Sequence, residues 1–250
     1  MTQPALQPQP SQAKLHPDPE RLALHAAGQL RPVERAVIET HLVFCPWCVE
    51  QLRELLEPGR RWLEELAGAP VGATTWERLE SRLDLAPADP AAAEFPDAGL
   101  SGALLPAATL EELGGDWTRK LAWRTVPTTR ARFAVLATDQ EADIELVLVG
   151  LEPGRRFPKH VHLGNEEVVL LAGAYTDEYA HLGAGNYYHY PPGSEHGTLI
   201  DAGEPCWTLG LLEHGIKFRG VLGALQWMAD PVTRARWRRF RRQSAMAARG

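Results

Sequence analysis

The stretch from Gly154 to Gly173, GRRFPKHVHLGNEEVVLLAG, constrains the fold of this chain more than any other segment. It places His160 and His162 two residues apart and Glu166 just after the turn-prone LGN. Because residues two apart on a β-strand face the same side, both imidazoles point into one interior, and the chain returning after the turn lets the carboxylate join them. Glu167 is the alternative to Glu166 as the acidic member of this cluster.

A second stretch, GNYYHYPPGSEHGTLI, opens with Gly185 and carries Pro191, Gly193 and His196 at fixed intervals. It supplies a fourth candidate ligand from another strand. Together the two stretches resemble the two signature motifs of the cupin superfamily, and they match every fixed position except the last, where Ile200 replaces the usual Asn. That Asn is not a ligand in the family, so the departure leaves the metal site untouched. The resemblance implies a small β-barrel that holds a metal ion.

The metal ligands predicted for the barrel are His160, His162, Glu166 and His196. Three neutral imidazoles and one carboxylate suit Zn²⁺ but also Fe, Mn or Ni, and the spacing does not choose among these ions. The polarity pattern beyond Trp117 agrees with a barrel, because short apolar or alternating runs are separated by Gly, Pro, Asp and Glu. These runs are RFAVLATD, DIELVLVGL, EEVVLLAGAY, NYYHYPPG and CWTLGLLEH.

Residues 18–85 have helical periodicity instead, and Pro and Gly residues divide them into four predicted helices. The segment HLVFCPWCVEQL lies within them and contains His41, Cys45 and Cys48. A thioredoxin-like redox pair requires a strand before the dithiol, whereas a helix precedes it here, so we favour a metal site. Tetrahedral Zn²⁺ needs one more ligand, which His16 or His25 could supply.

The arrangement of His16 ahead of H-x3-C-x2-C in a set of four helices resembles the zinc-binding domain of bacterial anti-sigma factors. In that family an aromatic residue usually occupies the position of His25, so the resemblance implies that His16 is the ligand and leaves His25 as the alternative. The implied zinc ligands are His16, His41, Cys45 and Cys48. The resemblance further implies that Zn²⁺ staples the helices and that the domain wraps an extracytoplasmic-function sigma factor.

The combination of this helical domain with one cupin domain is similar to the ChrR-like anti-sigma factors, from residue 16 to about residue 225. The resemblance implies that the chain sequesters its sigma factor from core RNA polymerase. It also implies release under oxidative or photo-oxidative stress, such as singlet oxygen, sensed by the cupin domain. The apolar residues expected to contact the partner are Trp62, Trp76, Leu79 and Leu83, although the tryptophans could instead pack internally.

The predicted fold is therefore multidomain, α then β, with a zinc-stapled four-helix anti-sigma domain followed by a cupin β-barrel. Its predicted parts are a disordered N-terminus (1–15), the helical domain (16–85), a Pro- and Ala-rich linker (86–106), the cupin domain (107–228) and an arginine-rich C-terminal tail (229–250).

Charge and hydropathy limit the classes of partner that this chain is expected to bind. The last twenty residues carry seven arginines, which leaves 19 basic and 32 acidic residues in the first 230, so we expect no direct nucleic-acid binding by the body. The N-terminus lacks the features of a signal peptide and no apolar run is long enough to span a bilayer, so we expect a cytoplasmic protein without membrane contact.

An enzyme is the main alternative function. Cupins with three histidines and one glutamate include metal-dependent dioxygenases, in which open coordination positions accept oxygen or substrate. Under that interpretation the zinc-binding helical domain is an accessory. The sequence contains no Ser/His/Asp set and no phosphate-binding Gly loop, so we favour a regulator that is not an enzyme.

Overall fold

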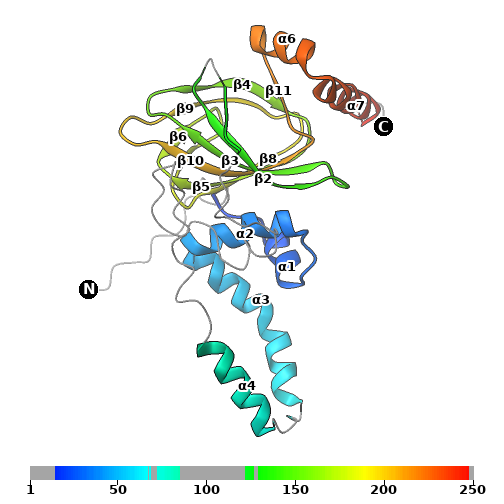
Figure 1. The fold of residues 1–250 in the computed structure, drawn as a ribbon. Helices are drawn as coiled ribbons and strands as arrows, with labels where there is room; N and C mark the ends of the chain where they lie inside the picture. The colour runs from blue at the N-terminus through cyan, green and yellow to red at the C-terminus, as the bar shows by residue number, and fades with distance from the viewer. Residues whose placement is uncertain (1–14, 67, 69–71, 85–121, 127–128, 248–250) are drawn as a thin grey trace, which may run out of the picture.

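The computed structural model describes residues 15–66, 68, 72–84, 122–126 and 129–247. The predicted linker at 86–106 lies outside these residues, as does all of the predicted disordered segment except Leu15. Within these described residues, four helices come first, eleven strands follow, and two further helices come last. The predicted order, a helical region followed by an antiparallel β-barrel or sandwich, is confirmed (Figure 1).

The N-terminal helices are α1 (Pro19–Ala26), α2 (Pro32–Phe44), α3 (Pro46–Glu65) and α4 (Ala73–Asp84). The first three begin with proline, whose fixed φ and missing N–H suit the first turn of a helix. A capping box starts α2, since Glu34 accepts a hydrogen bond of 2.8 Å from the backbone N–H of Arg31. The connections between these helices are short, which holds their ends close together.

The strands are β1 (Arg124–Thr125), β2 (Arg132–Asp139), β3 (Ile144–Leu151), β4 (Arg156–His162), β5 (Glu166–Ala172), β6 (Ala174–Thr176), β7 (His181–Gly183), β8 (Tyr187–Tyr190), β9 (Glu195–Ile200), β10 (Cys206–Glu213) and β11 (Ile216–Phe218). They form two antiparallel sheets, with strand orders β1-β2-β3-β10-β5-β8 and β11-β4-β9-β6-β7. The inner faces enclose an apolar interior that includes Leu170, Tyr190 and Ile200.

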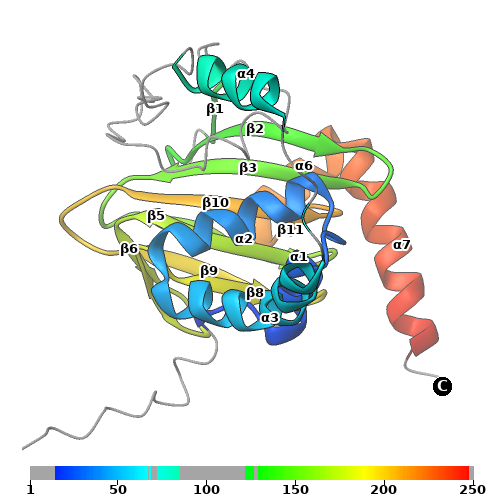
Figure 2. The same cartoon turned by 90° about the horizontal axis from the view of Figure 1, so that it is seen from below.

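Helix α2 lies against the outer face of the six-stranded sheet (Figures 1 and 2). Val37 and Ile38 of α2 are completely buried in the same apolar core as Leu148 of β3 and Leu209 of β10. Burial of a single large aliphatic side chain contributes about 1.5–3 kcal/mol, so a shared core of this kind holds the helical region firmly on the sheet. Helices α1 and α2 and the start of α3 therefore share one core with the β-sandwich.

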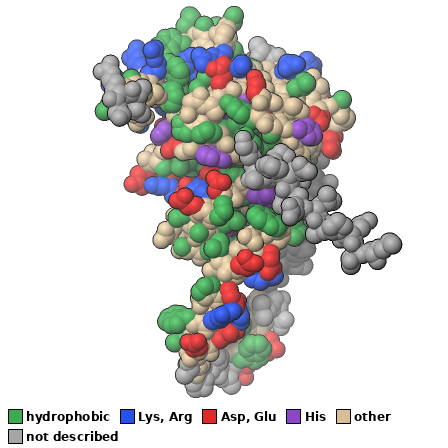
Figure 3. All heavy atoms as spheres, turned by 180° about the vertical axis from the view of Figure 1, so that it is seen from behind, with side chains coloured by type: hydrophobic (Ala, Val, Ile, Leu, Met, Phe, Trp, Pro, Cys, Tyr) green, Lys and Arg blue, Asp and Glu red, His purple; other side chains and the backbone are tan. Residues whose placement is uncertain are grey.

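The distal part of α3 and the whole of α4 project away from the β-sandwich (Figure 1). Large apolar side chains are exposed on these helices, among charged ones (Figure 3). We refer to Trp62, Leu63, Trp76 and Leu79 as the projecting surface. Exposed apolar groups concentrated in this way are typical of a surface that binds a partner.

Helices α6 (Gly220–Ala229) and α7 (Pro231–Ala247) close the described part of the chain beside β11. The arginine-rich segment forms α7, which Arg236 anchors to the sandwich through an ion pair of 2.9 Å with Asp143. Lys217 of β11 lies 4.8 Å from the ring centroid of Trp237. None of the described helices combines the length and the apolarity that crossing a bilayer requires.

Candidate metal centres

Four predicted ligands from the helical region converge in the structure. His16 precedes α1, His41 lies in the last turn of α2, Cys45 separates α2 from α3, and Cys48 lies in the first turn of α3. One donor atom from each lies within 4.8 Å of the others, and we name this group the helical cluster. The alternative residue, His25, lies in α1 outside the cluster.

The local sequence explains this convergence. Cys45 precedes Pro46, which disfavours helical backbone at the cysteine, and its φ of −120° and ψ of 91° end α2 there. The chain turns and starts α3 at once, so the Cys45 sulfur accepts a hydrogen bond of 3.4 Å from the backbone N–H of Cys48. His41 lies one helical turn before Cys45, and its Nε2 is 3.3 Å from the Cys48 sulfur.

The protonation states of the helical cluster fit a divalent cation. Burial lowers the pKa of His41 to about 4, so the imidazole is neutral, and its Nδ1–H donates a 2.9 Å hydrogen bond to the Gly185 carbonyl. The Nε2 lone pair is thereby directed to the sulfurs. Burial and the nearby Cys45 raise the pKa of the Cys48 thiol, because two adjacent buried thiolates repel each other. A divalent cation would offset the repulsion between the two thiolates. Two histidines with two cysteines also form a common Zn²⁺ ligand set.

The four ligands predicted for the barrel also converge, and we name them the barrel cluster. His160 and His162 lie on β4, Glu166 begins β5, and His196 lies on β9, directly opposite His160 in the strand pairing. Their donor atoms lie within 4.8 Å of one another. The Nε2 atoms of His160 and His196 are 3.1 Å apart, and Nδ1 of His162 is 3.2 Å from Glu166 Oε2.

Hydrogen bonds outside the barrel cluster fix two of its imidazoles. Nδ1–H of His160 donates to the Pro158 carbonyl at 2.9 Å, and Nδ1–H of His196 donates to Asp177 Oδ2 at 2.7 Å, so both Nε2 atoms face inward. Both ring nitrogens of His162 are buried and have no hydrogen-bond partner among the described residues. A buried polar atom without a partner costs free energy. A metal ion bound by His162 would satisfy one of its two ring nitrogens.

Burial also sets the charges of the barrel cluster. It lowers the pKa of His160 to about 3 and of His162 to about 2, so both rings present neutral lone pairs. The same burial raises the pKa of Glu166 to about 7, because the interior does not solvate a carboxylate. A divalent cation would hold this carboxylate ionised. The donor set therefore fits a metal ion, without identifying which one.

Asp177 is a functional residue that the sequence analysis missed. Its side chain is completely buried, and it accepts hydrogen bonds from His196, from Tyr190 Oη at 2.5 Å and from the backbone N–H groups of Tyr179 and Ala180 at 2.8 Å. Burial opposes its ionisation, but these hydrogen bonds prevail and hold the pKa of Asp177 below its usual value. No motif marks this residue; the only available signal was the general need of a metal-bound histidine for an acceptor on its other nitrogen.

Asp177→Asn is expected to weaken metal binding by the barrel cluster about 10–100-fold, the usual effect of removing an acceptor behind a metal-bound histidine. Chelator competition on the purified chain measures the affinity. Asp201→Asn is the matched control, because Asp201 accepts from His181 at 2.9 Å on the exposed surface. Equal affinities for Asp177→Asn and wild type would show that Asp177 does not position His196.

The residues predicted to bind a partner lie on the projecting helices. Trp62 of α3 is 62% exposed, and Trp76 and Leu79 of α4 are 58% and 46% exposed. The tryptophans thus do not pack internally in this structure. Leu83 belongs to the last turn of α4, where its side chain lies outside the described part of the chain.

Comparisons with known proteins agree with the domain order. The family described as ChrR Cupin-like domain matches residues 117–210. Anti-sigma-E factor ChrR of Cereibacter sphaeroides is 28% identical over 204 residues, which are 82% of this chain and 92% of that protein. The crystal structure of Rhodobacter sphaeroides SigE in complex with the anti-sigma ChrR matches with a TM-score of 0.56 and 27% identity, over 79% of this chain and 98% of that chain.

A weaker likeness involves an enzyme. An acetylacetone dioxygenase from Acinetobacter johnsonii matches over 40% of this chain and 74% of that chain, with 16% identity and a TM-score of 0.37. These values carry no functional argument. The similarity to ChrR, by contrast, is too long to be confined to the β-sandwich and includes the helical region.

Proposed function

We propose that this chain, a ChrR-like anti-sigma factor by sequence and domain order, binds an extracytoplasmic-function sigma factor through its helical region and releases it under oxidative stress. The observation that carries the proposal is the similarity to ChrR across both regions, including a solved complex of ChrR with SigE. The protein acts in the cytoplasm, where it keeps the sigma factor from core RNA polymerase.

The projecting surface is the binding site in this proposal. Trp62 and Trp76 are more than half exposed on two helices that extend beyond the β-sandwich. Large aromatic side chains contribute most of the binding free energy at protein interfaces. A sigma factor that covers these side chains would be blocked sterically from contacting the polymerase.

Zn²⁺ in the helical cluster maintains this surface. The cluster ties the residue before α1 to the junction between α2 and α3, so losing the ion frees the helix ends from one another. Because structural Zn²⁺ contributes folding free energy, chemical loss of a ligand becomes loss of affinity for the sigma factor.

The barrel cluster senses the stress signal. Beside it lies a cavity of about 90 Å³ with a largely apolar wall that includes Val147, Val149 and Val168. Pockets for drug-sized ligands measure roughly 300–1,000 Å³, so this space admits a molecule of only a few atoms. Singlet oxygen and the head of a hydroperoxide are small enough to reach the ligands, and this size limit favours an oxidant signal over a bulky substrate.

Co-expression with an extracytoplasmic-function sigma factor, the one encoded beside the gene if there is one, tests the proposed function, followed by affinity purification and size-exclusion chromatography. We expect a stable 1:1 complex. If no extracytoplasmic-function sigma factor co-purifies and the metal-loaded chain instead consumes oxygen with an organic substrate, the chain is a cupin enzyme and not an anti-sigma factor.

His160→Ala is expected to separate sensing from binding. It removes one barrel ligand and no residue of the projecting surface or of the helical cluster, so the affinity for the sigma factor should fall by no more than about 10-fold, far less than on loss of a helical-cluster ligand. Sigma-dependent transcription after an oxidant challenge should lose most of its induction, which a reporter promoter measures. Normal induction in this variant would assign sensing to another part of the chain.

A further inference from the structure

Strands β5 and β8 face the barrel cluster on one side and the helical region on the other. Successive side chains on a strand point to opposite faces. On β5, Glu166 points into the barrel cluster and Glu167 points outward to the helices. On β8, the ring of Tyr190 stacks on His162 inside the barrel, with centroids 5.3 Å apart, while Tyr187 points outward. The two strands pair directly with each other.

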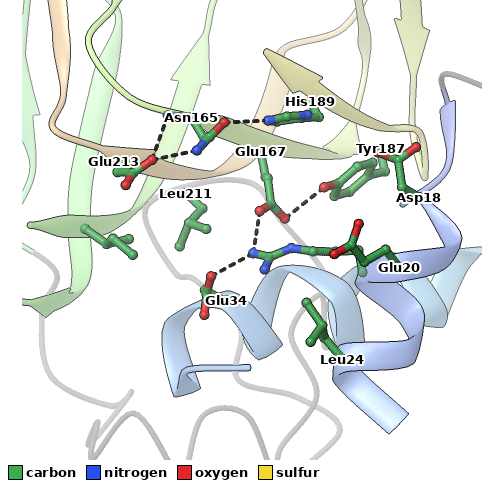
Figure 4. A pocket seen from close by; sticks show the side chains of 12 residues that line it. Asp18, Glu20, Leu24, Glu34, Asn165, Glu167, Tyr187, His189, Leu211 and Glu213 are labelled. Carbon is green, nitrogen blue, oxygen red and sulfur yellow. Dashed lines mark hydrogen bonds and ion pairs between the residues drawn. The ribbon is translucent and has the colours of Figure 1, made fainter. Parts of the chain in front are cut away.

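A single outward carboxylate joins this strand pair to two helices (Figure 4). Glu167 is 5% exposed and accepts hydrogen bonds from Arg21 of α1 at 2.5 Å and from Tyr187 Oη at 2.8 Å. Arg21 also donates to Glu34 of α2 at 3.0 Å. Separating the members of such a largely buried ion pair leaves Glu167 without its charged partner, so the contact resists separation. A small displacement of β5 therefore shifts the ion pairs that hold α1 and α2 on the sheet.

The turn that leads into β8 carries a second connection. His41, a member of the helical cluster, donates its Nδ1–H to the carbonyl of Gly185 in this turn. Gly185 has a φ of +85°, and a Cβ at this position would lie 2.8 Å from Cβ of Phe44. The end of α2 thus rests directly on the backbone of the turn. The ring of His41 is also 5.9 Å from that of Tyr187.

We infer that the β5–β8 pair couples the two metal clusters, so that loss of the ion from the barrel cluster loosens α1 and α2 on the sheet and weakens the helical cluster. The inference rests on the proposed function, because it takes both clusters as metal sites. Without a cation, Glu166 at the start of β5 is no longer held through the metal to the imidazoles of β4 and β9, so the start of β5 is freer to move, and Glu167, the next residue, moves with it. Coupling of binding free energies is reciprocal, so disrupting the helical cluster weakens metal binding in the barrel by the same factor.

Hydrogen–deuterium exchange on the full chain, without any sigma factor, tests the inference. His162→Ala on β4 and His196→Ala on β9 each remove a ligand of the barrel cluster without substituting any residue of β5 or β8. Both variants should speed exchange of the α2 amides (Pro32–Phe44) by about 5-fold or more, the lower end of typical couplings, and should speed reaction of Cys45 and Cys48 with a thiol reagent. Circular dichroism verifies that each variant is folded.

Glu167→Gln should uncouple the clusters: exchange in α2 is then already fast, and emptying the barrel cluster changes it less than about two-fold. Tyr187→Phe removes the hydrogen bond to Glu167 and should also make α2 exchange less responsive to loss of the barrel ion. Arg31→Gln is the matched control, because Arg31 joins the start of α2 to Asp139 of β2 at 2.8 Å in the same interface without touching β5 or β8. This variant should keep the full response to loss of the barrel ion.

Two results would overturn the inference: α2 exchange that does not respond to the barrel ion, or Arg31→Gln abolishing the response as completely as Glu167→Gln. A chain that shows the coupling but binds no sigma factor contradicts the proposed function alone. A chain that binds a sigma factor but shows no coupling contradicts only the inference. A barrel cluster that takes up no metal overturns both the inference and the proposed sensor.

Discussion

Replacing His41 with alanine is expected to abolish zinc binding by the helical cluster and, with it, binding of the sigma factor. His41 contributes an imidazole to the cluster and also anchors α2 to the turn at Gly185. Structural Zn²⁺ sites provide apparent binding free energies of about 10–16 kcal/mol that also fold the domain. We therefore expect the affinity for the sigma factor to fall by at least about 100-fold, or roughly 2.8 kcal/mol, in isothermal titration calorimetry.

His25→Ala is the matched control for this experiment. His25 is a half-buried histidine of the same helical region, outside the cluster, and its buried Nδ1 has no hydrogen-bond partner among the residues described. Its substitution should leave zinc content and sigma affinity unchanged. Tight sigma binding by zinc-free His41→Ala, or an equal loss in the two variants, would show that the helical cluster does not maintain the binding site.

Replacing Trp62 and Trp76 together with alanine is expected to have the second-largest effect. Both side chains are more than half exposed in the free chain and become buried only if a partner covers the projecting surface. Interface tryptophans commonly contribute about 2 kcal/mol or more each, so the double variant should lose at least about 100-fold in sigma affinity. Its free energy of unfolding should change by less than about 1 kcal/mol, because exposed side chains contribute little to folding.

Val221→Ala is the control for removing an exposed apolar side chain outside the projecting surface. Val221 is 79% exposed on α6, away from the projecting surface, so its removal should leave sigma affinity unchanged. Calorimetric titration and thermal unfolding of both variants separate binding from stability. Sigma affinity that survives loss of both tryptophans would place the interface elsewhere on the chain.

The sequence was most informative where spacing and chemistry act together. The run RFAVLATD coincides with β2, and the runs around Val147 and Leu209 contain β3 and β10, because alternation and flanking turn residues mark strands locally. The cupin motifs and the anti-sigma pattern each identified four residues, and the structure brings each set of four together as one cluster. Short-range geometry specifies part of each cluster: a helical turn joins His41 to Cys45, and strand alternation joins His160 to His162. His16 and His196 lie 29 and 36 positions from Cys45 and His160, and they were identified from the motifs.

The contacts between the two regions could not be predicted in the same way. Periodicity indicates that Val33 and Val37 lie on an apolar face of α2, but it does not say what covers that face. The structure packs it on the six-stranded sheet. Likewise Arg21 and Glu167 are 146 positions apart, and no local pattern in either segment predicts their ion pair. Long-range partners of this kind follow only from the assembled fold.

Asp177 illustrates a second reason why part of the site was missed. It lies behind the barrel ligands and contacts His196, so its position is set by the shape of the barrel and not by a motif. Acceptors behind metal ligands can come from any neighbouring strand. The chemistry predicts that such a residue exists, whereas its identity depends on tertiary structure.

Native mass spectrometry of the chain co-expressed with its sigma factor tests the central claim most directly. We predict one dominant species that contains one copy of each protein and two divalent ions, one for each cluster. A chain that stays free of any sigma factor, or a complex that forms without an ion in the helical cluster, would contradict the account.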